Sequence, residues 1–243
     1  MASRKRSTSS SRGARGGEEL QAIYRILHAA YGAQHWWPGA SPFEVVVGAI
    51  LTQRVAWSNV ERAIASLKEA GLMSPASLVQ APLDRVASLI RPSVYYNAKA
   101  EKLRAFLDLL FERHGGDLGR LFALPIDLLR RELLSVRGIG EETADAIILY
   151  AAGKPTFVVD AYTRRILSRL GLVEERVRYN ELRAVFMESL RPDAALYNEY
   201  HALLVRHGKE RCSSRPVCAD CPLRARCAFP DNSQGTPQEA KEE

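Results

Sequence analysis

Apolar residues recur three and four positions apart along almost the whole of this chain, and this spacing constrains the fold more than any other feature. Alternation at every second residue, the pattern of half-buried strands, is scarce. The sequence therefore predicts an all-α protein. We expect ten helices, at 18–31, 41–53, 57–70, 83–90, 97–113, 126–135, 141–152, 161–170, 178–189 and 193–207.

Several helix ends are marked by the residues that favour them. Ser41, Pro42 and Glu44 stand in the order of a capping box, with a polar cap, a proline in the first turn and a glutamate at the third position. Gly71 and Gly171 each follow a predicted helix and can take the left-handed conformation that ends one.

The net charge of +6 is a weak argument for a nucleic-acid partner, because it is uneven along the chain. Residues 1–17 hold five basic residues and no acid, and we expect this Ser-, Gly- and Arg-rich tail to be disordered. The tail either increases the solubility of the protein or tethers it non-specifically to nucleic-acid phosphates. A second disordered tail is expected at 231–243. No stretch is apolar enough for a membrane span or a secretory signal.

The four cysteines of the chain lie within sixteen residues, in the pattern C-x5-C-x2-C-x5-C. They are Cys212, Cys218, Cys221 and Cys227. A disulfide scaffold would spread its cysteines, so the clustering indicates a metal site, either structural zinc or an iron–sulfur cluster. Zinc sites of this size usually show two close pairs, whereas only the central pair is close here, which favours one [4Fe–4S] cluster.

A glycine turn between two predicted helices is the strongest local signal for DNA. Arg137, Gly138, Ile139 and Gly140 form this turn. Two glycines let the backbone approach another surface, and the N–H groups that begin the second helix favour an anion such as a phosphate. Ile139 would anchor the turn in the core. An ordinary tight turn remains the alternative for Gly-x-Gly alone.

An apolar run delivers Asp160 to the start of the next helix, twenty residues after Gly140. The simple role is a helix cap, for which aspartate is well suited. A fixed carboxylate at that place could also stabilise an oxocarbenium-like transition state and orient a water. Both roles can hold together.

Together these motifs resemble the endonuclease III superfamily of DNA glycosylases. The match covers roughly residues 20–228 and consists of LLSVRGIGEETADAI, FVVDAYTRRIL, YYNAKAEKL and HGKERC before the cysteines. The resemblance implies two helical lobes that flank a DNA cleft. One is a six-helix barrel with the hairpin, at 39–152, and the other joins 18–38 to 153–230 and carries the cluster. It also implies a [4Fe–4S] cofactor and double-stranded DNA with a damaged base as partner.

The resemblance also assigns roles to individual residues. Asp160 matches the catalytic aspartate of the family. Gln53 matches the residue that fills the hole left by a flipped base, Tyr95 the wedge that opens the stack, and Lys99 a lysine that contacts the DNA backbone.

One departure from the family pattern predicts a different reaction. Bifunctional members carry a lysine two residues after the second hairpin glycine, where this chain has Glu142. A carboxylate cannot form the imine of the lyase reaction. We therefore expect a monofunctional glycosylase whose strand-cleaving activity is weak or absent.

Three tryptophans indicate the substrate. Trp36, Trp37 and Trp57 either pack in the core or, with Glu142, line a base pocket. The Trp36-Trp37-Pro38 element followed by the Gln53 segment and an aromatic residue is similar to a 3-methyladenine DNA glycosylase branch of the superfamily. An aromatic pocket favours a cationic alkylated purine.

The sequence thus predicts a cytoplasmic, nucleoid-associated repair glycosylase for alkylated purines, with no membrane or obligate protein partner. Two alternatives stay open: an endonuclease III-like enzyme for oxidised or deaminated pyrimidines with weak lyase activity, and a non-catalytic damage-binding or redox-sensing protein. The remaining polar candidates are expected to be structural or solvated, namely His28, His114, His201, His207, Arg130, Arg131, Arg164 and Arg165.

Overall fold

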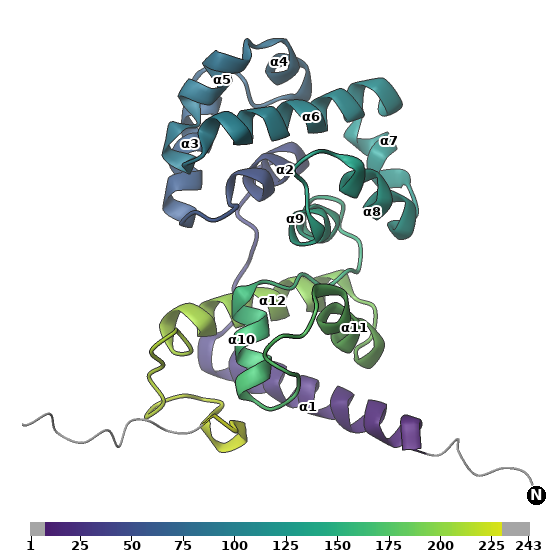
Figure 1. The fold of residues 1–243 in the computed structure, drawn as a ribbon, viewed down its shortest axis with the longest axis vertical. Coiled ribbons are helices and arrows are strands. Elements are labelled where there is room, and N and C mark those ends of the chain that lie inside the picture. Colours follow the sequence, from purple (N-terminus) through teal and green to yellow (C-terminus); the bar gives the residue numbers. More distant parts are fainter. Residues whose placement is uncertain (1–7, 230–243) are drawn as a thin grey trace, which may run out of the picture. The chain divides into compact units, whose positions relative to one another are not determined.

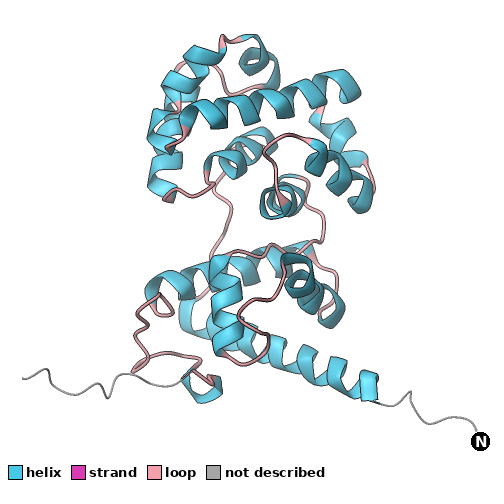
Figure 2. Cartoon of the chain, in the orientation of Figure 1, coloured by secondary structure: helices cyan, strands magenta, loops and turns pink. Residues whose placement is uncertain are grey.

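The computed structural model describes residues 8–229, and within them the chain consists only of helices and loops (Figure 2). The predicted all-α class is confirmed. None of the helices in this described part combines the length and the apolar character that a membrane span requires. The expected tail at 231–243 lies outside the described residues, as does the first part of the basic tail.

The contacts divide the chain into two compact units. The first, which we call the hairpin unit, comprises His35–Val158 and Pro192–Asn198. The second, the cysteine unit, comprises the described parts of Met1–Gln34, Val159–Arg191 and Glu199–Glu243. The expected boundaries at 38/39 and 152/153 lie four and six residues from those of the contacts.

The hairpin unit is built around the buried helix α2 and the long helix α6, against which several of the other helices pack (Figure 1). Its elements are α2 (Pro42–Leu51), α3 (Trp57–Glu69), α4 (Pro75–Gln80), α5 (Leu83–Leu89), a 3₁₀ turn (Arg91–Ser93), α6 (Tyr96–His114), α7 (Leu118–Ala123), α8 (Ile126–Ser135), α9 (Glu141–Ala146) and a π-helical turn (Ile147–Ala151). The sequence analysis missed α4 and α7, which are too short for their apolar spacing to repeat.

Helix α2 is the centre of this unit because every residue after Pro42 is buried. Ser41 caps it as predicted, accepting the backbone N–H of Glu44 at 3.2 Å. The Glu44 carboxylate accepts from Ala40, one residue before the cap, at 3.3 Å. These two hydrogen bonds fix the start of α2. The segment that leads to Gln53 follows directly after the buried end of this helix.

A buried ion pair joins α8 to α9 across the turn between them. The Asp145 carboxylate is fully buried and receives two bonds from the Arg130 guanidinium, at 3.0 and 3.1 Å. The Thr156 hydroxyl donates to the same carboxylate at 3.0 Å. The expectation that Arg130 lies on a solvated face was wrong, because its partner Asp145 is in the core.

The cysteine unit contains α1 (Thr8–Tyr31), α10 (Ala161–Arg169), α11 (Tyr179–Ser189), most of α12 (Ala194–Glu210) and a 3₁₀ turn (Arg224–Arg226). Helix α1 packs along α11 (Figure 1). It begins at Thr8, so the second part of the segment expected to be disordered is helical. Gly17 allows α1 to approach α11 closely, because a side chain there would meet the Ser189 carbonyl at 2.8 Å.

Candidate active site

The glycine turn has the backbone that its sequence requires. Gly138 has φ +88°, and a side chain there would lie 2.5 Å from the stem of Lys102 on α6. Ile139 is 5% exposed and anchors the turn in the core, as predicted. Arg137, Gly138 and Gly140 are exposed, and the space beside Gly140 is open. The turn therefore presents backbone N–H groups and one guanidinium outward.

Gln53 is tied to this turn by its side-chain amide. Its Nε2 donates to the Gly138 carbonyl at 3.2 Å and to the Thr143 hydroxyl at 2.9 Å. Its Oε1 accepts from Nζ of Lys102 at 2.5 Å. The structure thus brings Gln53 and the hairpin together, and it adds Lys102 as a residue that the sequence analysis missed.

Lys99 is not available to DNA, and the predicted contact is wrong. The side chain is 2% exposed, and its ammonium donates to the carbonyls of Leu51 at 2.7 Å and Ser93 at 2.5 Å. Burial, and then the charge of Lys102, lower its pKa to about 8. Lys99 therefore secures the end of α2 and the 3₁₀ turn before Tyr95.

Tyr95 is the most exposed large apolar side chain among the described residues, at 67%. It and Val94 both have positive φ, +49° and +56°, at the start of α6. The loop therefore projects two adjacent apolar side chains into solvent. This is the exposure expected of a wedge residue.

The three tryptophans form one half-buried aromatic cluster. Trp57 meets the rings of Trp36 and Trp37 edge-to-face, at centroid distances of 5.1 and 5.0 Å. Tyr150 in the π-helical turn adds a fourth ring, 5.1 Å from Trp37. Gly48 of α2 allows the close packing, since a side chain there would lie 3.1 Å from the Trp37 ring. Glu142 is exposed in the first turn of α9.

Asp160 belongs to the cysteine unit and caps α10. Its Oδ1 accepts the backbone N–H of Thr163 at 2.7 Å and the Thr163 hydroxyl at 2.9 Å. Its Oδ2 lies 3.6 Å from Nε2 of His201 on α12. Burial opposes ionisation, but the neighbouring His201 imidazole, followed by the bonds from Thr163, outweighs it, so the pKa of Asp160 lies below its ordinary value.

The four cysteines line a single cavity in the cysteine unit, with apolar walls from Ile166, Leu170 and Leu223. Burial raises the pKa of Cys221, so the thiol is favoured in the absence of a metal. No three His, Cys, Asp or Glu side chains in residues 8–229 are grouped to hold a single metal ion. An all-thiol donor set around one cavity nevertheless fits an iron–sulfur cluster, for which cysteine thiolates are the usual ligands.

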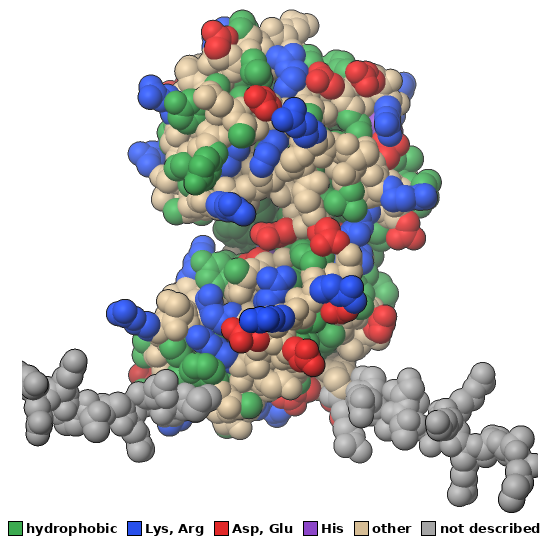
Figure 3. Space-filling model, in the orientation of Figure 1, with side chains coloured by type: hydrophobic (Ala, Val, Ile, Leu, Met, Phe, Trp, Pro, Cys, Tyr) green, Lys and Arg blue, Asp and Glu red, His purple; other side chains and the backbone are tan. Residues whose placement is uncertain are grey.

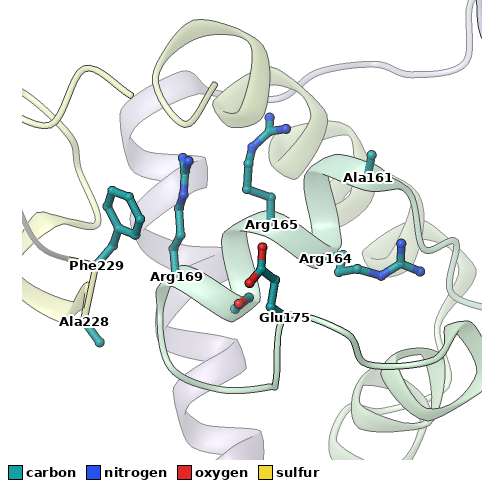
Figure 4. A pocket seen from close by; sticks show the side chains of 8 residues that line it. Ala161, Arg164, Arg165, Arg169, Glu175, Ala228 and Phe229 are labelled. Atoms are coloured by element: carbon teal, nitrogen blue, oxygen red, sulfur yellow. The ribbon is translucent and has the colours of Figure 1, made fainter. Parts of the chain in front are cut away.

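Two arginines of α10 hold the cysteine loop. Arg165 donates to the carbonyls of Cys212 at 2.7 Å and Gly208 at 3.2 Å, so its predicted solvated position was wrong. Arg169 donates to the Cys212 sulfur at 3.2 Å and lies over the Phe229 ring. Figure 4 shows both side chains rising from α10 beside a cavity of about 550 Å³.

His207 also reaches the loop. Its Nδ1 lies 2.9 Å from the Tyr31 hydroxyl, and its Nε2 lies 3.8 Å from the Cys221 sulfur. The sequence analysis expected only structural roles for His201 and His207. Their neighbours lie 41 and 14 residues away along the chain, and no local pattern could have indicated those contacts.

On the face shown in Figure 3, positive and negative side chains are interspersed on both units. The charge argument therefore stays local, as expected from the sequence. A glycine hairpin that faces outward, and an ionised aspartate that caps a helix, define the described residues 8–229 as a helix-hairpin-helix fold with a candidate hydrolytic centre.

Comparison with known families gives the particular group. A model of the HhH-GPD superfamily of base excision DNA repair proteins matches residues 47–192. The chain belongs to this superfamily. It is 43% identical, over 86% of its own length and 96% of the other's, to the Methanocaldococcus jannaschii protein MJ1434, whose name gives its function, provisionally, as a DNA repair glycosylase.

Two solved structures have similar folds. The 3-methyladenine DNA glycosylase MagIII of H. pylori, bound to 1,N6-ethenoadenine, is 28% identical with a TM-score of 0.69, over 80% of this chain and 97% of that one. A non-covalent endonuclease III–DNA complex is 22% identical with a TM-score of 0.75, over 87% and 94%, and supports the fold alone. The predicted resemblance to the endonuclease III superfamily is confirmed.

The two hairpin glycines are expected to respond differently to substitution. Gly138→Ala should lower the free energy of unfolding by about 1–2 kcal/mol or more, because it combines a positive φ with a clash against Lys102. Gly140→Ala should cost less than about 1 kcal/mol, since its φ is negative and its surroundings are open. Urea denaturation of both variants measures the difference in unfolding free energy. Equal losses for the two variants would contradict the argument that only Gly138 requires a glycine.

Proposed function

We propose that the protein is a monofunctional DNA glycosylase that hydrolyses the N-glycosidic bond of an alkylated purine in double-stranded DNA. The observation that carries this proposal is the Asp160 carboxylate, which is part-buried, fixed at the start of α10 and kept ionised. A preorganised negative charge stabilises the oxocarbenium-like transition state of glycosidic cleavage without having to reorganise during the reaction.

In the proposed reaction a water molecule is the nucleophile and the Asp160 carboxylate assists it. The bond from C1′ to the base nitrogen breaks, and its electron pair leaves with the base. Water forms the new C1′–O bond and gives up a proton. Oδ2 of Asp160 is suited to orient this water and to accept its proton. The product is an abasic site in an intact strand.

The residue after the hairpin argues against strand cleavage. A lyase needs an amine that attacks C1′ and forms an imine, and the matching position holds Glu142, an exposed carboxylate. Lys99 and Lys102 do not substitute for it, because their ammonium groups are bonded to backbone carbonyls and to Gln53.

The aromatic cluster supports an alkylated purine as substrate. The half-exposed rings of Trp36, Trp37 and Trp57 offer electron-rich surfaces for a purine that carries positive charge. Such a base already has a weakened glycosidic bond and leaves without a strong general acid. The likeness to MagIII, which was solved with a modified adenine, agrees with this assignment.

The hairpin and the wedge loop are proposed to hold the DNA. The exposed N–H groups of Gly138 and Gly140 and the Arg137 side chain would bind backbone phosphates. Tyr95 would enter the stack, and Gln53, braced by Lys102, would occupy the space of the flipped base.

Cys212, Cys218, Cys221 and Cys227 would hold a [4Fe–4S] cluster. When bound, the cluster would crosslink the four cysteine thiolates and so shape the loop. Arg165 and Arg169 orient that loop from α10 through its backbone carbonyls.

The first test uses labelled duplexes that carry alkylated purines, oxidised pyrimidines, uracil mismatches or a bare abasic site. We expect strand breaks on the alkylated purines only after hot alkali, because excision leaves the backbone whole. Breaks without alkali would reveal a lyase amine and overturn the argument from Glu142. Excision confined to pyrimidines would favour the endonuclease III-like alternative.

Asp160→Asn tests the carboxylate itself. Asparagine is also a good helix cap, so the start of α10 should persist while the charge is lost. We expect the single-turnover excision rate to fall by about 100-fold or more, with binding to an abasic-site analogue retained. Undiminished excision would exclude Asp160 as the catalytic group. Binding by the wild type without any excision would indicate a damage-binding protein.

Metal analysis tests the cofactor. The purified protein should contain about four irons and four sulfides per chain and absorb visible light, and Cys218→Ala should lower both iron content and absorbance. Every cysteine of the chain lies in the loop, so the assay has no competing thiol. A colourless protein with one zinc per chain would overturn the cluster.

A further inference from the structure

The two oxygens of the Asp160 carboxylate have different partners. Oδ1 takes both bonds from Thr163 and is committed to the helix cap. Oδ2 faces Nε2 of His201 at 3.6 Å, within the same unit. Because Oδ1 is occupied, Oδ2 is the oxygen that remains for chemistry at a sugar, and His201 is the side chain beside it.

His201 is held rigidly. The residue is 7% exposed and lies on α12 beside Tyr200, which is fully buried and donates through its hydroxyl to the Leu20 carbonyl of α1 at 2.8 Å. The Tyr200 ring also meets Phe186 of α11 edge-to-face at 5.5 Å. The backbone that carries the imidazole is thus fixed by two other helices.

We propose that His201 is the positioning residue of the catalytic carboxylate: its Nε2 fixes the orientation of Oδ2 and favours the charged form that the reaction needs. The proposal rests on the proposed function of Asp160. A carboxylate in this position loses hydration, and a donor that faces its second oxygen compensates for that loss. His201 would act through Asp160 and would not touch the substrate.

Three of the titratable and charged groups on the surrounding helices, Tyr179, Glu199 and Arg165, have partners elsewhere. On α11, the Tyr179 hydroxyl accepts the backbone N–H of Val159 at 3.4 Å. On α12, Glu199 accepts the Gln34 N–H at 2.7 Å. On α10, Arg165 donates to the Cys212 carbonyl, and Nε of Arg164 is buried without a hydrogen-bond partner. Of the groups named on these helices, His201 is the one that lies 3.6 Å from Oδ2.

The direction of the Asp160 pKa shift sets how the excision rate should depend on pH. The pKa of Asp160 is lowered in the folded protein, so the carboxylate stays ionised to a lower pH than an isolated aspartate. Removing His201 leaves burial opposed only by the bonds to Oδ1. Protonation then begins at higher pH, and the acid limb of the excision rate should move upward with it.

Two variants test the proposal. His201→Leu removes the donor, whereas His201→Gln keeps an N–H group within reach of Oδ2. The substrate is DNA methylated with a tritium-labelled methyl donor, and the single-turnover release of labelled base is measured across pH 4.5–9. We expect His201→Leu to lose about tenfold or more at the acid end, with a smaller loss at pH 8. His201→Gln should recover most of the rate.

A matched control removes another buried histidine with a carboxylate partner. His114, 9% exposed, lies 2.7 Å from Glu132 in the hairpin unit. His114→Leu should lower the thermal midpoint of unfolding without moving the acid limb. If His201→Leu reduces the rate by one factor at every pH, its role is merely structural and the proposal is overturned.

A second readout is independent of excision. The ¹³C resonance of the Asp160 carboxyl, assigned by its loss in Asp160→Asn, can be titrated in the wild type and in both His201 variants. We expect its midpoint to move to higher pH in His201→Leu and much less in His201→Gln. An unchanged midpoint would overturn the proposal. Failure of the wild type to release labelled base would contradict the proposed substrate and leave this titration decisive.

Discussion

The hairpin depends on the buried pair between Asp145 and Arg130. One carboxylate joins α8 to α9 and also accepts the Thr156 hydroxyl from the segment that continues to Asp160. Leaving one partner of such a pair without the other typically costs about 3–5 kcal/mol. The pair therefore fixes the geometry of the glycine turn between the two helices, and the exposed backbone at Gly138 and Gly140 relies on a charge that solvent does not reach.

The proposed functional groups rely on partners that have no contact with substrate in the proposed mechanism. Gln53 depends on Lys102 and Thr143, and the loop before Tyr95 depends on the ammonium group of Lys99. Burying the ammonium group of Lys99 is costly, and its hydrogen bonds to two backbone carbonyls offset this cost. Side chains that act on DNA must stay exposed. Their positions must therefore be fixed by neighbouring residues that are more buried.

How far the sequence predicted the structure depends on the range of the interaction. Helix positions, the Ser41 cap and the anchoring of Ile139 follow from local spacing, and the structure confirms them. Lys99 was misassigned because motif matching gives a position along the chain but not its burial. His201 was set aside because its partner Asp160 comes from another helix, and no pattern within α12 indicates that contact.

The π-helical turn at Ile147–Ala151 has a consequence for how this aromatic cluster can diversify. A π turn holds one residue more than an α-helical turn, and here it places Tyr150 against Trp37. Deleting one residue would restore the α-helical register and rotate the following side chains by about 100°. Related chains could therefore exchange one wall of the cluster through a single-codon deletion, leaving the tryptophans and the hairpin unaltered.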